Sequence, residues 1–114
     1  MPQFIIDCSE EIIKLKTPEE IMEVVYRVAE DTGLFADGDI KVRINPFKYF
    51  KLGPNKNNFI HIFGNIMEGR TISQKSDLST KMIQKLKIMF PDVPIISMNI
   101  REFEKATYCK KSMV

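Results

Sequence analysis

The most restrictive feature of this sequence is the segment 59–67, FIHIFGNIM, which is apolar at nearly every position. It is far too short to cross a membrane, and a short apolar run of this kind is typical of a strand buried within a sheet. Successive side chains of a strand point to opposite faces, so both faces of this strand are largely apolar. The fold must therefore cover at least one of these faces with helices.

Hydrophobic periodicity predicts three further strands and two helices around this segment. A helix begins at Thr17-Pro18-Glu19-Glu20, where Thr17 suits the N-cap and Glu20 completes a capping box, and it ends at Gly33. Pro91 ends the other helix. The turn residues 53–58 predict a hairpin between the second and third strands. The remaining predicted elements are strands at 2–8, 40–44 (with 46–52 as an extension) and 96–101, and a helix at 74–90.

The predicted order is β-α-β-β-α-β, which divides the chain into two β-α-β halves of similar length. Each half places its two strands parallel through a right-handed crossover. The expected fold is a single α/β domain over residues 1–114, an α+β sandwich with a four-stranded mixed sheet and two helices on one face. Residues 108–114 are expected to form a short polar tail.

Composition excludes several classes of function. The 17 Lys and Arg against 15 Asp and Glu give a net charge of +2, too mild for a nucleic-acid-binding protein but compatible with a small anionic ligand. Two cysteines give neither a disulfide framework nor a metal site. Cys8 alternates with core residues, and His61 lies in the most apolar strand, so both are expected to be structural. With no signal peptide or membrane span, the cytosol is the expected location.

The start Met1-Pro2 offers one candidate catalytic group. Aminopeptidases remove an initial methionine when a small residue follows, and proline would then carry a free secondary amine. Burial or a nearby cation lowers the pKa of such an amine, and a neutral amine is a competent general base. From Met-Pro alone, the simple start of an edge strand is the commoner interpretation.

The surrounding residues change this balance. The opening MPQFIIDCS, together with Thr32-Gly33-Leu34-Phe35 and Gly69-Arg70-Thr71-Ile72, resembles the 5-carboxymethyl-2-hydroxymuconate isomerases of the tautomerase superfamily. The resemblance extends from residue 2 to about 104. It implies the tautomerase fold, an enzyme without cofactor, and Pro2 as the base that converts an unsaturated 2-hydroxy dicarboxylate or tricarboxylate enol to its conjugated ketone. It also implies a place in the breakdown of aromatic compounds.

Three cationic residues are candidates for binding the carboxylates of such a substrate. Arg70 follows the third strand, and its guanidinium matches a carboxylate in bidentate geometry. The family leads us to expect an arginine where this chain has Lys41, with Arg43 on the same strand face, so either could contact the ligand. A solvated loop position for Arg70 and an exposed polar face for Arg43 remain the alternatives.

Two other functions compete with this interpretation. One is a tautomerase with a different physiological substrate, and the other is a non-catalytic β-α-β-β-α-β binding or regulatory module. A homotrimer is expected in either enzyme, partly because two helices cover only one face of the sheet and leave apolar side chains of the third strand exposed. The resemblance supplies the number three, since tautomerases pack three such units with their sheets facing a central axis.

Overall fold

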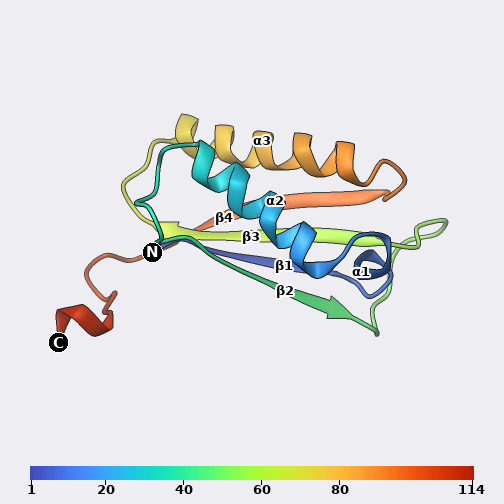
Figure 1. Ribbon diagram of the computed structural model, residues 1–114, viewed down its shortest axis with the longest axis horizontal. Coiled ribbons are helices and arrows are strands. Elements are labelled where there is room, and N and C mark those ends of the chain that lie inside the picture. Colours follow the sequence, from blue (N-terminus) through green and yellow to red (C-terminus); the bar gives the residue numbers. More distant parts are fainter.

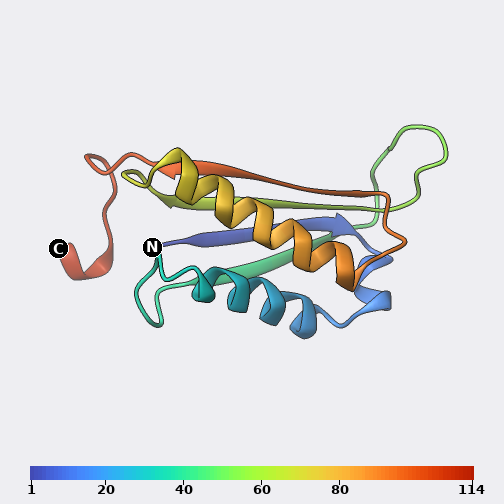
Figure 2. The same cartoon turned by 90° about the horizontal axis from the view of Figure 1, so that it is seen from above.

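The computed structural model describes residues 1–114 and has two layers, a four-stranded sheet and two long helices. The strands β1 (Gln3–Ser9), β2 (Lys41–Phe47), β3 (Phe59–Met67) and β4 (Ile95–Phe103) lie in the order β2-β1-β3-β4. Helices α2 (Pro18–Asp31) and α3 (Ile72–Met89) lie on the same face of the sheet (Figures 1 and 2). This arrangement confirms the predicted fold class. None of the helices has the length and apolarity that a bilayer crossing requires.

Strand β1 lies between β2 and β3, and this order overturns the predicted hairpin. β2 runs parallel to β1, and β4 parallel to β3, as two β-α-β crossovers require. β3 pairs antiparallel with β1 instead of with β2. The turn residues do form a tight bend, with Asn55 at a φ of 63°, but the bend belongs to a loop that carries the chain from one side of β1 to the other.

Local signals account for the positions of both long helices. Thr17 and Glu20 form the predicted capping box at the start of α2, and Gly33, with a φ of 69°, follows its end. A second capping box, formed by Thr71 and Gln74, starts α3 two residues before the predicted position. The sequence did not predict α1 (Ile12–Leu15), a single turn that buries Ile12 against β1.

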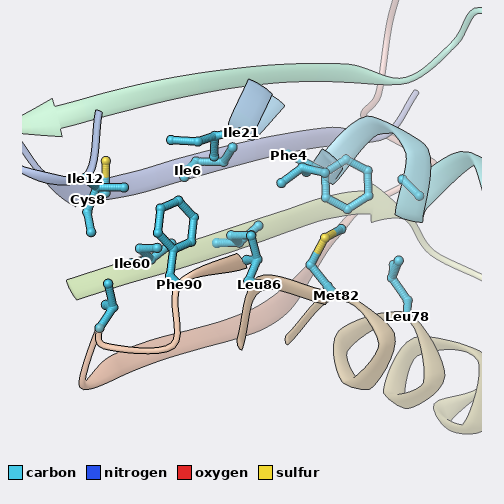
Figure 3. Packing of buried hydrophobic residues seen from close by; sticks show 14 of the residues in the cluster. Phe4, Ile6, Cys8, Ile12, Ile21, Ile60, Leu78, Met82, Leu86 and Phe90 are labelled. Atoms are coloured by element: carbon cyan, nitrogen blue, oxygen red, sulfur yellow. The ribbon is translucent and has the colours of Figure 1, made fainter. Parts of the chain in front are cut away.

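The core fills the space between the helices and one face of the sheet (Figure 3). As predicted, β1 contributes Phe4, Ile6 and Cys8, all fully buried. Burial of each large apolar side chain stabilises the fold by about 1.5–3 kcal/mol. Gly64 leaves room for the Met98 side chain, because a Cβ atom at position 64 would lie 2.8 Å from it. The other fully buried contributors include Ile60, Ile62, Ile21, Val25, Leu78, Met82 and Leu86.

The helix-free face of the sheet carries more polar than apolar side chains. The third strand does place apolar side chains there, as expected, namely Phe59, Phe63 and Met67, all partly exposed. Ile5 and Phe63 form a small apolar centre, and the Arg101 guanidinium lies 4.3 Å from the centroid of the Phe63 ring. The segment 59–67 alone could not show the excess of polar side chains, because the neighbouring strands supply most of the face. Its polar members are Gln3, Asp7, Lys41, Arg43, Asn45, His61, Asn65, Ser97, Asn99 and Arg101.

The two cysteines should differ in reactivity. Burial, followed by the charge of Asp7, raises the pKa of the Cys8 thiol to about 11, whereas Cys109 is exposed. We expect 5,5′-dithiobis(2-nitrobenzoate) at pH 8 to titrate one thiol in the native protein and two after unfolding. The Cys109→Ser variant should show no native thiol, and rapid labelling of that variant would contradict the buried position of Cys8.

Candidate active site

One end of the sheet gathers most of the residues that the sequence singled out. The register pairs Gln3 with Lys41 and with Asn65, so β1 and β2 begin where β3 ends. Pro2 is buried at this end, and its carbonyl accepts a hydrogen bond of 3.0 Å from the backbone N–H of Lys41. Arg70 follows β3 by three residues and also lies at this end. The fold therefore places Pro2, Lys41 and Arg70 around the amino end of β1.

In this structure Met1 precedes Pro2, so the proline nitrogen belongs to a peptide bond. The Met1 ammonium lies 3.8 Å from a carboxylate oxygen of Asp39, and its side chain is largely buried, with 20% exposure. An amide nitrogen is not a base, and hence Pro2 gains proton-transfer chemistry only in the form that lacks Met1. Removal of Met1 also uncovers the space that this residue fills.

Arg70 is held by three contacts, two with the segment after α2 and one with the end of β3. Its Nη2 donates to the Leu34 carbonyl at 2.7 Å, its Nη1 donates to the Met67 carbonyl at 3.2 Å, and its guanidinium lies 5.1 Å from the centroid of the Phe35 ring. Gly69, at a φ of 114°, makes the turn that directs Arg70 back toward these groups. Arg70 thus ties the segment after α2 to the end of β3, a structural role that the sequence did not predict.

Lys41 and Arg43 share a strand face, as predicted, but only Lys41 adjoins the N-terminus. The Lys41 Nζ lies 3.6 Å from the Met1 sulfur and 3.3 Å from the Asp39 carbonyl oxygen. Arg43 lies further along β2, where its Nη1 donates to the Gln3 side-chain oxygen at 2.9 Å. The structure therefore favours Lys41 over Arg43 as a cation next to Pro2.

His61 lies away from this end, on the helix-free face. Its Nδ1 is 2.6 Å from the Ser97 hydroxyl oxygen, and its Nε2 is 2.6 Å from the Asn99 side-chain oxygen. Both ring nitrogens thus have partners and the side chain is partly buried, which agrees with the structural role expected for His61. No group of three His, Cys, Asp or Glu side chains is placed to hold a metal ion.

Several residues at the Pro2 end were not singled out as functional by any pattern in the sequence. Phe35 packs edge-on against Phe4, with ring centroids 6.0 Å apart, and positions the Arg70 guanidinium. Asp39 and the tail residues Lys110 and Lys111 line an open hollow of about 650 Å³ beside Met1. In the sequence, the adjacent lysines are the only feature of the tail that suggests a function. No local pattern shows that the tail lies near the N-terminus.

The contacts of Arg70 predict a cost in stability when its donors are lost. Hydrogen bonds from charged groups contribute about 1.5–3 kcal/mol, so Arg70→Met should lower the free energy of unfolding by about that amount. The control is Arg27→Met, which removes an exposed pair with Glu23 and should lower the free energy of unfolding much less. Urea denaturation measures both, and equal losses would contradict the structural role of Arg70.

Solved structures with the same fold cover nearly the whole chain. A 5-carboxymethyl-2-hydroxymuconate isomerase from Deinococcus radiodurans R1 aligns with a TM-score of 0.83 at 20% identity, over 96% of this chain and 88% of that one. A 5-carboxymethyl-2-hydroxymuconate delta-isomerase gives 0.81 at 11% identity, over 96% and 87%. A fused 4-OT asymmetric trimer gives 0.76 at 12% identity, over 96% and 92%. At these identities the likeness establishes the tautomerase-type fold.

The family assignment comes from the sequence. A search of curated proteins found no match. The model of the family described as 5-carboxymethyl-2-hydroxymuconate isomerase, in contrast, matches residues 2–114, which include Pro2, Lys41 and Arg70. The match includes the polar tail beyond residue 104, where the resemblance in the sequence ends. The chain therefore belongs to the 5-carboxymethyl-2-hydroxymuconate isomerase family.

Proposed function

We propose that this protein is a cytosolic isomerase in which Pro2, freed by removal of Met1, acts as the general base on an unsaturated 2-hydroxy dicarboxylate or tricarboxylate. The observation that carries the proposal is the convergence of Pro2, Lys41 and Arg70 at one end of the sheet in a member of this family. The substrate that fits best resembles 5-carboxymethyl-2-hydroxymuconate. The product is the conjugated keto isomer.

The proposed reaction moves one proton and needs no redox partner. The neutral amine of Pro2 accepts the proton of the 2-hydroxyl group as the O–H bond breaks, which leaves a dienolate. The resulting proline ammonium then delivers the proton to a carbon of the conjugated system, where a new C–H bond forms. The amine returns to its neutral form, so the base is regenerated in each cycle.

The surroundings of Pro2 support a neutral amine near physiological pH. Pro2 is buried when Met1 is in place, and the Lys41 Nζ lies 3.6 Å from the sulfur of Met1, the residue that precedes it. Burial and a neighbouring cation both disfavour the charged form of an amine. The rate should fall at low pH, because the base becomes protonated.

The cations also have a role toward the substrate. The Lys41 ammonium is exposed and is free to bind the carboxylate next to the enol, and its charge stabilises the dienolate. Arg70 uses Nη1 and Nη2 on backbone carbonyls, and a guanidinium has five N–H donors in all. We assign the remaining donors of Arg70 to a substrate carboxylate.

Substitution of Pro2 tests the proposed base. Pro2→Ala should lower kcat on 2-hydroxymuconate by up to about 100-fold, with residual activity from its primary amine. A second form, with a lysine placed between Met1 and Pro2, should retain Met1, keep proline in a peptide bond and lose activity completely. Intact mass verifies the N-terminus of each form. The dependence of kcat/KM on pH reports the pKa of the catalytic amine.

Full activity in the form with the blocked proline would refute the proposed mechanism. It would leave the fold and the family unaffected. A protein with intact Pro2, no Met1 and no activity on any enol acid would instead favour the binding-module alternative.

We further propose that the working form is a homotrimer. Fused 4-OT relatives with this fold are described as trimers. Strands β2 and β4 are both sheet edges, and β4 presents an unpaired backbone edge from Ile95 to Phe103. Such an edge is a template for pairing with a second chain. Because polar side chains outnumber apolar ones on the helix-free face, we expect backbone pairing at the edges to contribute more than apolar contact to holding the copies together.

Light scattering coupled to size exclusion tests the assembly. The wild type should elute with three times the monomer mass of 13.2 kDa. Met98→Pro removes a backbone donor from edge strand β4, and it should weaken the trimer if β4 forms the contact. Val42→Pro is the matched control in the other edge strand, β2. Comparing the two variants shows which edge forms the contact between copies. An active wild-type monomer at micromolar concentration would overturn the proposal.

A further inference from the structure

The hollow beside the N-terminus has a composition suited to an anion. Its walls come from Met1, Asp39 and the tail residues Lys110, Lys111 and Ser112. Figures 1 and 2 both show the tail lying beyond the end of the sheet at which the chain begins. The segment that the sequence suggested was a mere polar terminus is thus part of the surface around Pro2.

Positive charge dominates this hollow. The lining includes Lys110 and Lys111, and the Lys41 Nζ is close by, 3.6 Å from the Met1 sulfur and 3.3 Å from the Asp39 carbonyl oxygen. Asp39 is the one acidic side chain in the lining, and it is 3.8 Å from the Met1 ammonium. When Met1 is removed, Lys110 and Lys111 remain in the lining, Lys41 remains near it, and Pro2 becomes the terminal residue next to the space that Met1 filled.

Contacts with the sheet hold the tail in place. The Phe103 and Tyr108 rings pack in a tilted arrangement with centroids 5.5 Å apart, and the backbone N–H of Lys105 donates to the Glu68 carboxylate at 3.1 Å. Glu68 lies in the same turn as Arg70, so one turn supports both the arginine and the tail. Met113 closes the last turn through its N–H, which donates to the Lys110 carbonyl at 2.9 Å.

We propose that Lys110 and Lys111 form a second carboxylate-binding subsite, which selects substrates with two or more carboxylates. The inference rests on the function proposed above. Lys41 and Arg70 would hold the carboxylate next to the enol, and the tail lysines would hold the distal one. Because the distal carboxylate takes no part in proton transfer, its binding should affect KM more than kcat.

The test compares two substrates of different charge. The double variant Lys110→Gln/Lys111→Gln should lower kcat/KM for 2-hydroxymuconate, a dicarboxylate, by about 10- to 100-fold, mainly through KM. The same variant should change kcat/KM for phenylenolpyruvate, a monocarboxylate enol, by less than threefold. Lys51→Gln/Lys56→Gln removes the same charge from the loop at the opposite end of the sheet, and it should leave both substrates unchanged.

Equal losses for the two substrates, or no loss for either, would overturn the subsite. If the wild type isomerises neither substrate, the proposed function fails and the subsite is judged by binding alone. Calorimetric titration with tricarballylate, a tricarboxylate, should then give a dissociation constant at least tenfold lower for the wild type than for Lys110→Gln/Lys111→Gln. Equal dissociation constants would refute the subsite independently of catalysis.

Discussion

Strand β1 has a neighbouring strand on each side, and the other elements take their places from this position. Its parallel partner β2 must be reached through α2, and its antiparallel partner β3 begins the second crossover through α3. Phe4, Ile6 and Cys8 on one face of β1 then lie under both helices. A residue placed immediately before β1 is therefore held at the centre of one sheet end, between the start of β2 and the end of β3.

The central position of β1 also explains which groups surround Pro2. Loops that follow α2 and β3 converge there, and Arg70 joins them through the carbonyls of Leu34 and Met67. A network of this type fixes a cation near the N-terminus without burying it, since Arg70 is only partly covered. The loops between elements thus position the charged side chains at this end, and the strands supply the rigid framework that holds these loops.

Local features of the sequence predicted most of the fold, because each depends on residues close in the chain. The capping box of Thr17 and Glu20 and the alternation of Phe4, Ile6 and Cys8 are examples. The hairpin prediction failed because a turn shows where the chain bends and not which strand lies between the bent segments. Pro2 and Arg70 were identified by resemblance. The carbonyl contacts of Arg70 and the approach of Lys110 to Met1 join distant segments, so no local pattern could show them.

The two β-α-β halves are built on nearly the same plan. Gln3 pairs with Lys41 and Phe59 pairs with Ile95, at almost equal distances along the chain, and each long helix starts with a threonine capping box. The antiparallel pairing of β1 with β3 relates the halves by an approximate twofold rotation, which places the counterpart of Pro2 at Asn58, at the far end of the sheet. Asn58 is inside the chain, and its side chain accepts a hydrogen bond from Ser9. A chain has one amino terminus, so only one of these two similar sheet ends can carry a free amine. The second β-α-β half therefore contributes to the fold and has no equivalent of this amine.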